Sequence, residues 1–206
     1  MTEKFRIAIV EDHPVMREGL ARWFADTGRW QVSGTAASLE GAKELLAAEG
    51  FQTDILLLDI QLEDGWGLDI ISWYTGHCGP GKQNGPLTAV YTAFDDYAHV
   101  SAALGMGVKA YVCKRRGERE LEEALLKALE GDICVDSTAR TKLQTVTDFV
   151  SLLTRREKEI LNMVKSGLSN KQIASGLGIS RRTVENILSC VYDKTGIKSR
   201  LELERL

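Results

Sequence analysis

A short apolar run that ends in an acidic residue constrains the fold of this chain more than any other feature. Residues 55–58 read ILLL, and Asp59 follows directly, with Ile60 beyond it. Consecutive apolar residues bounded by polar ones are typical of a strand buried on both faces, as the strands of parallel sheets are. Such a strand would place the Asp59 carboxylate at the carboxyl edge of a sheet.

Strand and helix patterns alternate along the first 131 residues. The segments with the apolar character of strands are residues 5–10, 30–37, 54–59, 87–93 and 109–113. The segments with helical patterns between and after them are residues 14–28, 38–50, 67–75, 95–107 and 118–131. This alternation predicts an α/β fold, with a doubly wound, five-stranded parallel sheet covered by helices on both faces.

The character of the sequence changes after residue 131. Residues 132–149 are polar without a clear period, and we interpret them as a linker. Residues 150–206 contain four short helical patterns and no strand pattern, which predicts a small all-α domain. Residues 1–149 carry 15 basic against 23 acidic residues, whereas residues 150–206 carry 11 against 6. The basic character of the second domain favours a nucleic-acid partner.

Several classes of protein do not fit this sequence. No apolar stretch is long enough to span a bilayer and the N-terminus has no secretory pattern, so we expect a cytoplasmic protein without a membrane partner. The four cysteines form no C-x-x-C pair, which argues against structural disulfides and a zinc site. Residues 76–83, GHCGPGKQ, lack the Ser or Thr of a phosphate-binding P-loop and follow a helix, so we interpret them as part of an enlarged loop.

Polar side chains stand at the carboxyl ends of the predicted strands, where ligands bind in open parallel sheets. They are Glu11 and Asp12 after the first strand, Asp59 at the end of the third, Thr92 in the fourth and Lys114 after the fifth. Clustered carboxylates need a cation, and oxygen ligands with retained water suit Mg²⁺. A carboxylate beside bound Mg²⁺ can attack phosphorus, while a lysine and a hydroxyl bind phosphoryl oxygens. The set predicts a magnesium site in which Asp59 accepts a phosphoryl group.

The segments VEDHPVMREGL, LLLDI, YTA and AYVCK resemble the signature sequences of bacterial response-regulator receiver domains. The resemblance implies a flavodoxin-like fold in which Asp59 is the phospho-acceptor. It implies a Mg²⁺ site made by Glu11, Asp12, Asp59 and the backbone carbonyl of Gln61. It also implies phosphate-binding and switch roles for Thr92, Tyr111 and Lys114. The donor implied is a sensor histidine kinase, and the receiver is then a phosphoryl acceptor with at most slow self-dephosphorylation rather than an enzyme.

The basic domain carries a helix–turn–helix pattern in residues 170–194, NKQIASGLGISRRTVENILSCVYDK. Ala174 is small where two helices approach, Gly178 suits a tight turn, and Ser180 can cap the second helix. From about Leu153 to the end, the sequence resembles the DNA-binding domains of LuxR- and NarL-type regulators. The two resemblances together imply a response regulator of the NarL/FixJ type that binds promoter DNA, as a homodimer when it is phosphorylated.

The recognition helix implied by this resemblance spans roughly residues 181–192, with its early residues in the major groove. Candidates for phosphate contacts are Lys171, Arg181, Arg182, Thr183, Lys194 and Lys198. The family's base-reading positions fall on Glu185, Asn186 and Ser189. The family usually has lysine at the position of Glu185 and histidine at that of Ile187; glutamate repels phosphate but can accept from cytosine N4. An alternative function is therefore a receiver-controlled protein-interaction regulator with weakened or lost DNA binding.

Overall fold

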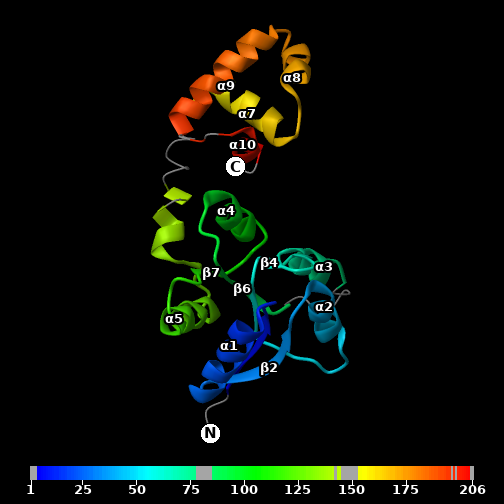
Figure 1. Ribbon diagram of the computed structural model, residues 1–206, viewed down its shortest axis with the longest axis vertical. Coiled ribbons are helices and arrows are strands. Elements are labelled where there is room, and N and C mark those ends of the chain that lie inside the picture. The colour runs from blue at the N-terminus through cyan, green and yellow to red at the C-terminus, as the bar shows by residue number, and fades with distance from the viewer. Residues whose placement is uncertain are drawn as a thin grey trace. The chain divides into compact units, whose positions relative to one another are not determined.

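The computed structural model describes residues 4–77, 85–141, 143–144, 153–195, 197 and 199–204 of the chain. The chain divides into two compact units, the first made of Met1–Asp95 and Ala102–Ala139 and the second of Asp96–Ser101 and Arg140–Leu206 (Figure 1). Within the described ranges, no helix has the length and hydrophobicity that a membrane crossing requires. Of the predicted loop residues 76–83, residues 76–77 are helical, and residues 78–83 lie outside the described residues.

A parallel sheet of six strands forms the centre of the first unit. The strands are β1 (Phe5–Val10), β2 (Trp30–Ala36), β3 (Ile55–Leu58), β6 (Leu87–Thr92), β7 (Ala110–Cys113) and β8 (Cys134–Val135). They lie side by side in the order β2-β1-β3-β6-β7-β8, and every pairing is parallel. The first five strands in this order have the flavodoxin-like arrangement, which confirms the predicted doubly wound fold. A small antiparallel hairpin joins β4 (Gln61–Leu62) to β5 (Gly65–Trp66).

The prediction of five strands was wrong, because β8 adds a sixth. It pairs with β7 inside the stretch interpreted as a linker, residues 132–149. A strand of two residues is too short to produce a visible period, so the sequence pattern missed it. Residues 137–141 are helical, and the Asp136 carboxylate accepts the Thr138 N–H at 2.8 Å at the start of that helix. The first part of the predicted linker is thus regular structure.

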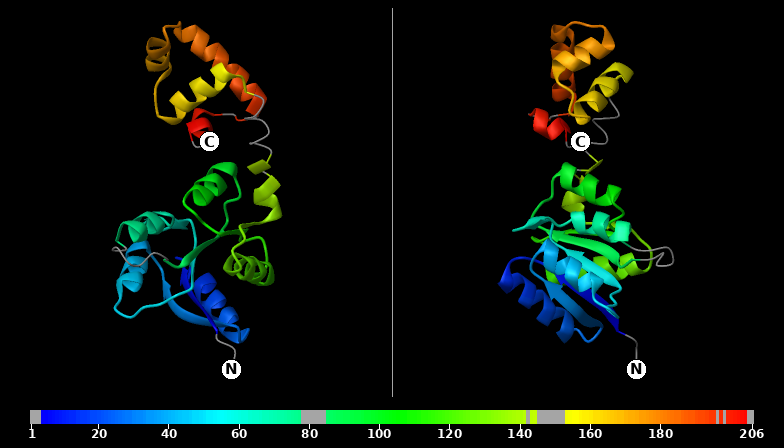
Figure 2. Two further views of the ribbon diagram at one scale, coloured as in Figure 1. Left: turned by 180° about the vertical axis from the view of Figure 1, so that it is seen from behind. Right: turned by 90° about the vertical axis from the view of Figure 1, so that its right-hand side faces the viewer.

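Helices cover both faces of the sheet, as predicted (Figures 1 and 2). They are α1 (Pro14–Asp26), α2 (Leu39–Ala47), α3 (Asp69–His77), α4 (Tyr97–Gly105) and α5 (Glu118–Leu129). Ile55 and Leu57 pack with α1 and α5 in one apolar core, whereas Leu56 and Leu58 pack with α2 and α3 in another. Strand side chains alternate between the two faces of a sheet, so burial on both faces explains the unbroken apolar run.

The second unit is helical, as its four helical patterns predicted. Its helices are α7 (Arg155–Lys165), α8 (Asn170–Leu177), α9 (Arg181–Thr195) and α10 (Arg200–Glu204). Ala174 and Val184 belong to the apolar core that these helices share. Gly178 has a φ of +63° at the turn between α8 and α9, a conformation that glycine adopts without steric cost. The Thr183 N–H donates to Ser180 Oγ at 3.0 Å, which confirms the predicted cap.

A charged contact joins the start of α7 to the end of α9. Glu157 is buried, and both of its carboxylate oxygens lie 2.8 Å from Lys194 Nζ. Glu157 Oε2 also accepts the Thr154 N–H at 2.7 Å, which completes a capping box at the start of α7. The hydrogen bonds from Lys194 and from Thr154 hold the pKa of Glu157 below its ordinary value. This contact helps to fix the direction of α9.

We expect Glu157→Gln to destabilise the second unit and to make its stability less sensitive to acid. A carboxyl group whose pKa is lower in the folded chain stabilises the fold above the unfolded pKa, and this contribution is lost as pH falls through the folded pKa. The wild-type unfolding midpoint should therefore fall more steeply than that of the variant below pH 4.5, the ordinary pKa. At pH 7 the variant should unfold on the order of 5 °C lower.

Scanning calorimetry of the full chain over a series of pH values measures both effects. The control is Glu159→Gln, which removes an exposed ion pair with Arg156 on the same helix. Exposed ion pairs contribute little to stability, so the control should unfold close to the wild type at pH 7. Parallel pH curves for the wild type and Glu157→Gln would contradict the role given to this carboxylate.

Candidate functional site

The carboxyl ends of the strands bring the predicted polar groups to one edge of the sheet. The Asp59 N–H donates to the Val10 carbonyl at 2.9 Å, which places Asp59 beside Glu11. The Lys114 N–H donates to the Thr92 carbonyl at 2.7 Å, two strand pairings further along the sheet. The strand order reverses between β1 and β3, so this edge is the switch point at which doubly wound sheets bind ligands.

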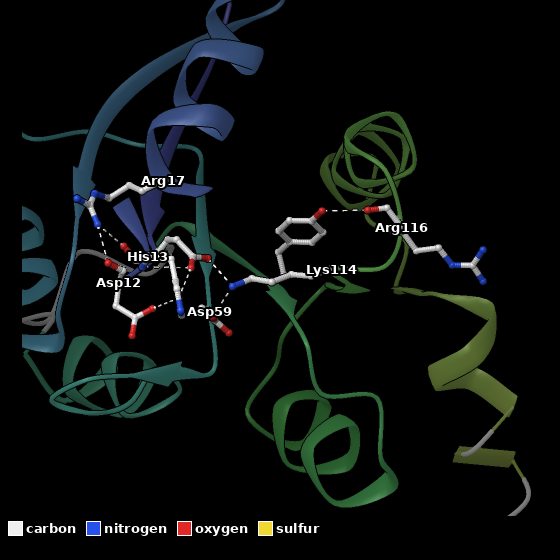
Figure 3. A network of polar contacts seen from close by, with 8 residues as sticks. Asp12, His13, Arg17, Asp59, Lys114 and Arg116 are labelled. Carbon is white, nitrogen blue, oxygen red and sulfur yellow. Dashed lines mark hydrogen bonds and ion pairs between the residues drawn. The ribbon is translucent and has the colours of Figure 1, made fainter. Parts of the chain in front are cut away.

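Lys114 joins two of the acidic side chains at this edge (Figure 3). Its Nζ lies 2.5 Å from Asp59 Oδ2 and 2.7 Å from Glu11 Oε2. The Glu11 side chain is only 2% exposed and that of Asp59 is 8% exposed, so solvent screens these ion pairs weakly. Burial disfavours the charge on Lys114, but the hydrogen bonds to Asp59 and Glu11 outweigh burial and raise its pKa. The Lys114 side chain therefore stays protonated at neutral pH.

Three buried oxygen atoms at this edge have no hydrogen-bond partner among the described residues. They are Asp12 Oδ1, Asp59 Oδ1 and Thr92 Oγ1. A buried polar atom without a partner is unfavourable, and in native structures such an atom is explained by a function or a bound group. A cavity of about 780 Å³ adjoins the acids, and Asp12, Gln61 and Phe94 are among the residues that line it. The arrangement suits a small polar ligand in front of Asp59.

The oxygen atoms around this cavity fit a divalent cation. Glu11, Asp12 and His13 each offer one ligand atom, and these atoms lie within 4.8 Å of one another. His13, which the sequence analysis did not consider, holds its Nδ1 2.8 Å from Asp12 Oδ1 (Figure 3). Mg²⁺ binds carboxylate and carbonyl oxygens together with water. Asp59 Oδ1 is a further carboxylate oxygen, and Gln61 borders the same cavity.

Two further residues that hold this edge in place were also missed by the sequence analysis. Arg17, in the first turns of α1, donates from Nη1 to the carbonyls of Glu11 and Asp12 at 2.8 and 3.1 Å (Figure 3). The Tyr91 hydroxyl donates to the Arg116 carbonyl at 2.9 Å and so anchors the chain after Lys114. Burial, followed by the charge of Glu118, raises the pKa of Tyr91 to about 12, so this phenol remains a donor.

Tyr111, the predicted switch aromatic, is connected to the site only indirectly. Its ring is fully buried in β7, and its hydroxyl donates to the Phe94 carbonyl at 2.9 Å. Phe94 lines the cavity next to Asp59, and it follows Thr92 by two residues in the chain. The segment that leaves β6 therefore begins at Thr92, and the Tyr111 hydroxyl holds it through the Phe94 carbonyl.

Gly67 lets the chain fold back against Asp59 after the β4–β5 hairpin. The Gly67 N–H donates to the Ile60 carbonyl at 2.6 Å. A Cβ atom at Gly67 would lie 1.9 Å from the Asp59 carbonyl oxygen, far inside van der Waals contact. Only glycine, which has no Cβ atom, therefore fits this close approach of the backbone at residue 67 to the Asp59 carbonyl. The approach sets the path of the loop that carries Gln61.

In the second unit, most of the predicted DNA contacts are exposed to solvent. The exposed ones are Lys171 on α8 and Arg181, Arg182, Thr183, Glu185, Asn186 and Ser189 on α9. Lys194 differs, because its ammonium group is held by Glu157, and its role in phosphate contact stays a prediction. Lys198 lies outside the described residues.

An ion pair occupies the first turns of α9. Arg181 Nε donates to Glu185 Oε1 at 2.8 Å, and these side chains are 71% and 45% exposed. The spacing of four residues places both side chains on the same side of the helix. Arg182, the next residue, makes no ion pair or side-chain hydrogen bond with any described residue. The two neighbouring arginines thus differ in whether their charge is already neutralised.

Comparison with known proteins assigns both units. Residues 7–126 match the family model described as "Response regulator receiver domain", and residues 151–206 match "Bacterial regulatory proteins, luxR family". The chain belongs to the response-regulator family. This response regulator combines a receiver domain with a LuxR-type DNA-binding domain, so the predicted family and fold are confirmed.

Similar proteins span nearly the whole chain. The response regulator is 28% identical over 205 residues to the transcriptional regulatory protein YdfI of Bacillus subtilis, covering 96% of this chain and 92% of that one. It is 26% identical over 203 residues to the response regulator VraR of Staphylococcus aureus, covering 96% and 93%. A structure of RcsB dimers bound to DNA superimposes with a TM-score of 0.73 at 20% identity, covering 98% and 97%, which supports the fold.

We expect Gly67→Ala to destabilise the receiver domain by about 1–3 kcal/mol, because the added methyl group overpacks the site against the Asp59 carbonyl. Gly76→Ala is the matched control, since Gly76 lies in α3 and a Cβ atom there meets no atom within 4 Å. Alanine is also favoured over glycine inside a helix, so the control should be neutral or slightly stabilising. Urea unfolding of both variants measures the difference, and equal midpoints would show that the loop relaxes at no cost.

Proposed function

We propose that this response regulator accepts a phosphoryl group on Asp59 from a sensor histidine kinase and that phosphorylation controls its binding to promoter DNA. The observation that carries the proposal is the buried contact of Lys114 with Asp59 and Glu11, which leaves Asp59 Oδ1 without a hydrogen-bond partner among the described residues. A nucleophile is most effective when its orientation is fixed and its attacking atom is free.

The transfer follows from the positions of these groups. Asp59 Oδ1 attacks the phosphorus atom, and the bond from phosphorus to the donor breaks as the new O–P bond forms. Lys114 remains protonated, because its pKa is raised, and its ammonium neutralises the phosphoryl oxygens. The hydroxyl of Thr92, which has no partner among the described residues, donates to another phosphoryl oxygen. The receiver domain is thus a stoichiometric acceptor with at most slow self-dephosphorylation.

The residues that would hold Mg²⁺ are Glu11, Asp12, Asp59 and the backbone carbonyl of Gln61. Support for this assignment comes from the carboxylate oxygens gathered at the cavity, which Gln61 also lines. When bound, the cation supplies positive charge that offsets the repulsion between the carboxylates and the incoming phosphoryl group.

Phosphorylation adds about −1.5 to −2 charges beside Lys114 and Thr92. We propose that the segment after β6, which begins at Thr92 and is held by the Tyr111 hydroxyl, changes in response. Moving a two-state switch from almost fully off to almost fully on needs on the order of 5 kcal/mol of differential stabilisation. The RcsB structure contains dimers on DNA, and we propose a homodimer on DNA for the phosphorylated form of this protein. The expected cytoplasmic location stays a prediction.

A second candidate function is a regulator that acts through protein partners and has weakened or lost DNA binding. Two predicted phosphate contacts, Arg181 and Lys194, are engaged by Glu185 and Glu157. These pairs remove positive charge from the helix that is expected to meet DNA. The first function is favoured, because Lys171 and Arg182 remain exposed and the helix–turn–helix geometry is intact.

We expect Asp59→Asn to abolish phosphorylation, because an amide cannot act as the nucleophile. The wild type should take up a single phosphoryl group when it is incubated with an acyl phosphate and Mg²⁺, and a chelator should prevent the reaction. Intact-protein mass spectrometry measures the uptake, and Glu18→Gln, an exposed change on α1, is the control. Full phosphorylation of Asp59→Asn would show that another residue is the acceptor.

We also expect phosphorylation of the wild type to tighten promoter binding by about 5- to 150-fold, the usual range for coupling between two sites. Asp59→Asn should bind like the unphosphorylated wild type under all conditions. Fluorescence anisotropy with labelled DNA and sedimentation of the free protein follow binding and dimerisation. If Asp59→Asn dimerises and binds DNA as the phosphorylated wild type does, phosphorylation is not the trigger.

A further inference from the structure

The first turns of α9 carry a negative side chain where a polyanion is expected to bind. Val184 and Leu188 are buried in the core, which leaves Glu185, Asn186 and Ser189 on the exposed surface of the helix. The early residues of a recognition helix lie against base edges in the major groove. A carboxylate in that position is repelled by the phosphates, so it needs both a counter-ion and a partner on the DNA.

Arg181 provides the counter-ion. Its Nε donates to Glu185 Oε1 at 2.8 Å, so the pair as a whole carries no net charge. Glu185 Oε2 makes no hydrogen bond with another described residue, and this oxygen can accept one from a ligand. An exposed pair of this kind adds little to stability, so the fold gains little from an acidic residue here. The ion pair therefore leaves Glu185 Oε2 able to accept a hydrogen bond from DNA, while Arg181 neutralises the charge of the carboxylate.

The bases differ in what they offer to such an oxygen. In the major groove only cytosine N4 and adenine N6 are hydrogen-bond donors, whereas guanine O6 and N7 and thymine O4 are acceptors that repel a carboxylate. Adenine also places its N7 acceptor beside N6, where the second carboxylate oxygen would meet it. Cytosine has no acceptor on this edge. A carboxylate therefore selects cytosine.

We propose that Glu185 is a specificity-determining residue that accepts a hydrogen bond from cytosine N4 in the major groove. Arg181 is the positioning residue, because its guanidinium group holds the Glu185 carboxylate in place. It also neutralises the negative charge of Glu185, which the DNA phosphates would otherwise repel. Arg182, which has no partner among the described residues, carries a charge that is free for a phosphate. This inference rests on the proposed binding of DNA and adds the base that the chain selects.

The test is selection from a random DNA pool with the full chain, in Mg²⁺ and beryllium trifluoride as a mimic of the phosphoryl group. The wild type should enrich a motif with a fixed cytosine. Glu185→Ala should keep the rest of the motif and lose about 5- to 150-fold of the discrimination at that position. Glu185→Gln should change the preferred base from cytosine to adenine, because glutamine pairs with adenine N6 and N7. Such a change of preference cannot come from a folding defect.

Variants at Arg181 and Arg182 distinguish a role in positioning Glu185 from a simple contribution of positive charge. Arg181→Gln should weaken the preference for cytosine without lowering the salt dependence of binding. The control Arg182→Gln should weaken binding to all sequences and reduce the salt slope by about 1, while the cytosine stays fixed. Selection by Glu185→Ala and Glu185→Gln of the same motif as the wild type would overturn the inference and leave DNA binding standing. If the wild type enriches no sequence, the proposed function fails and this inference fails with it.

Discussion

The rest of the receiver domain depends on the ion pairs that Lys114 makes with Asp59 and Glu11. Carboxylates at the ends of neighbouring apolar strands repel one another, and burying them without a partner would cost several kcal/mol. One ammonium group between them removes that penalty and fixes which oxygen of Asp59 faces the cavity. The parallel register of β1, β3 and β7 is what brings these three side chains together.

The sequence was sufficient to predict the elements that bury a continuous apolar surface. The run ILLL of β3 and the alternation of strands with helices have one compact solution, a parallel sheet covered on both faces. Short elements escaped prediction for a physical reason. β8 and the β4–β5 hairpin have two residues per strand, and their backbone pairing leaves no periodic signal.

Some residues of the candidate site could likewise be predicted from the sequence, and others could not. Glu11, Asp59 and Lys114 could be predicted, because the topology of a parallel sheet brings strand ends together whatever lies between them in the chain. Arg17 and Tyr91 could not, because their partners are backbone carbonyls, which every residue type has. The predicted phosphate contact of Lys194 is a different case. The sequence gives its charge, but only the fold shows that Glu157, which lies 37 residues away, already binds it.

The net charge of the DNA-binding domain therefore indicates less about DNA contacts than the ion pairing of its basic side chains does. Residues 150–206 have five more basic than acidic residues, yet the start of α9 carries a neutral pair followed by one unpaired arginine. Phosphate contacts supply affinity without choosing a sequence, whereas base contacts choose a sequence. A recognition helix that gives up one cation to hold a carboxylate loses affinity for DNA in general. What it gains is rejection of guanine and thymine at that position, because these two bases offer only acceptors in the major groove. This arrangement favours specificity over strength of binding.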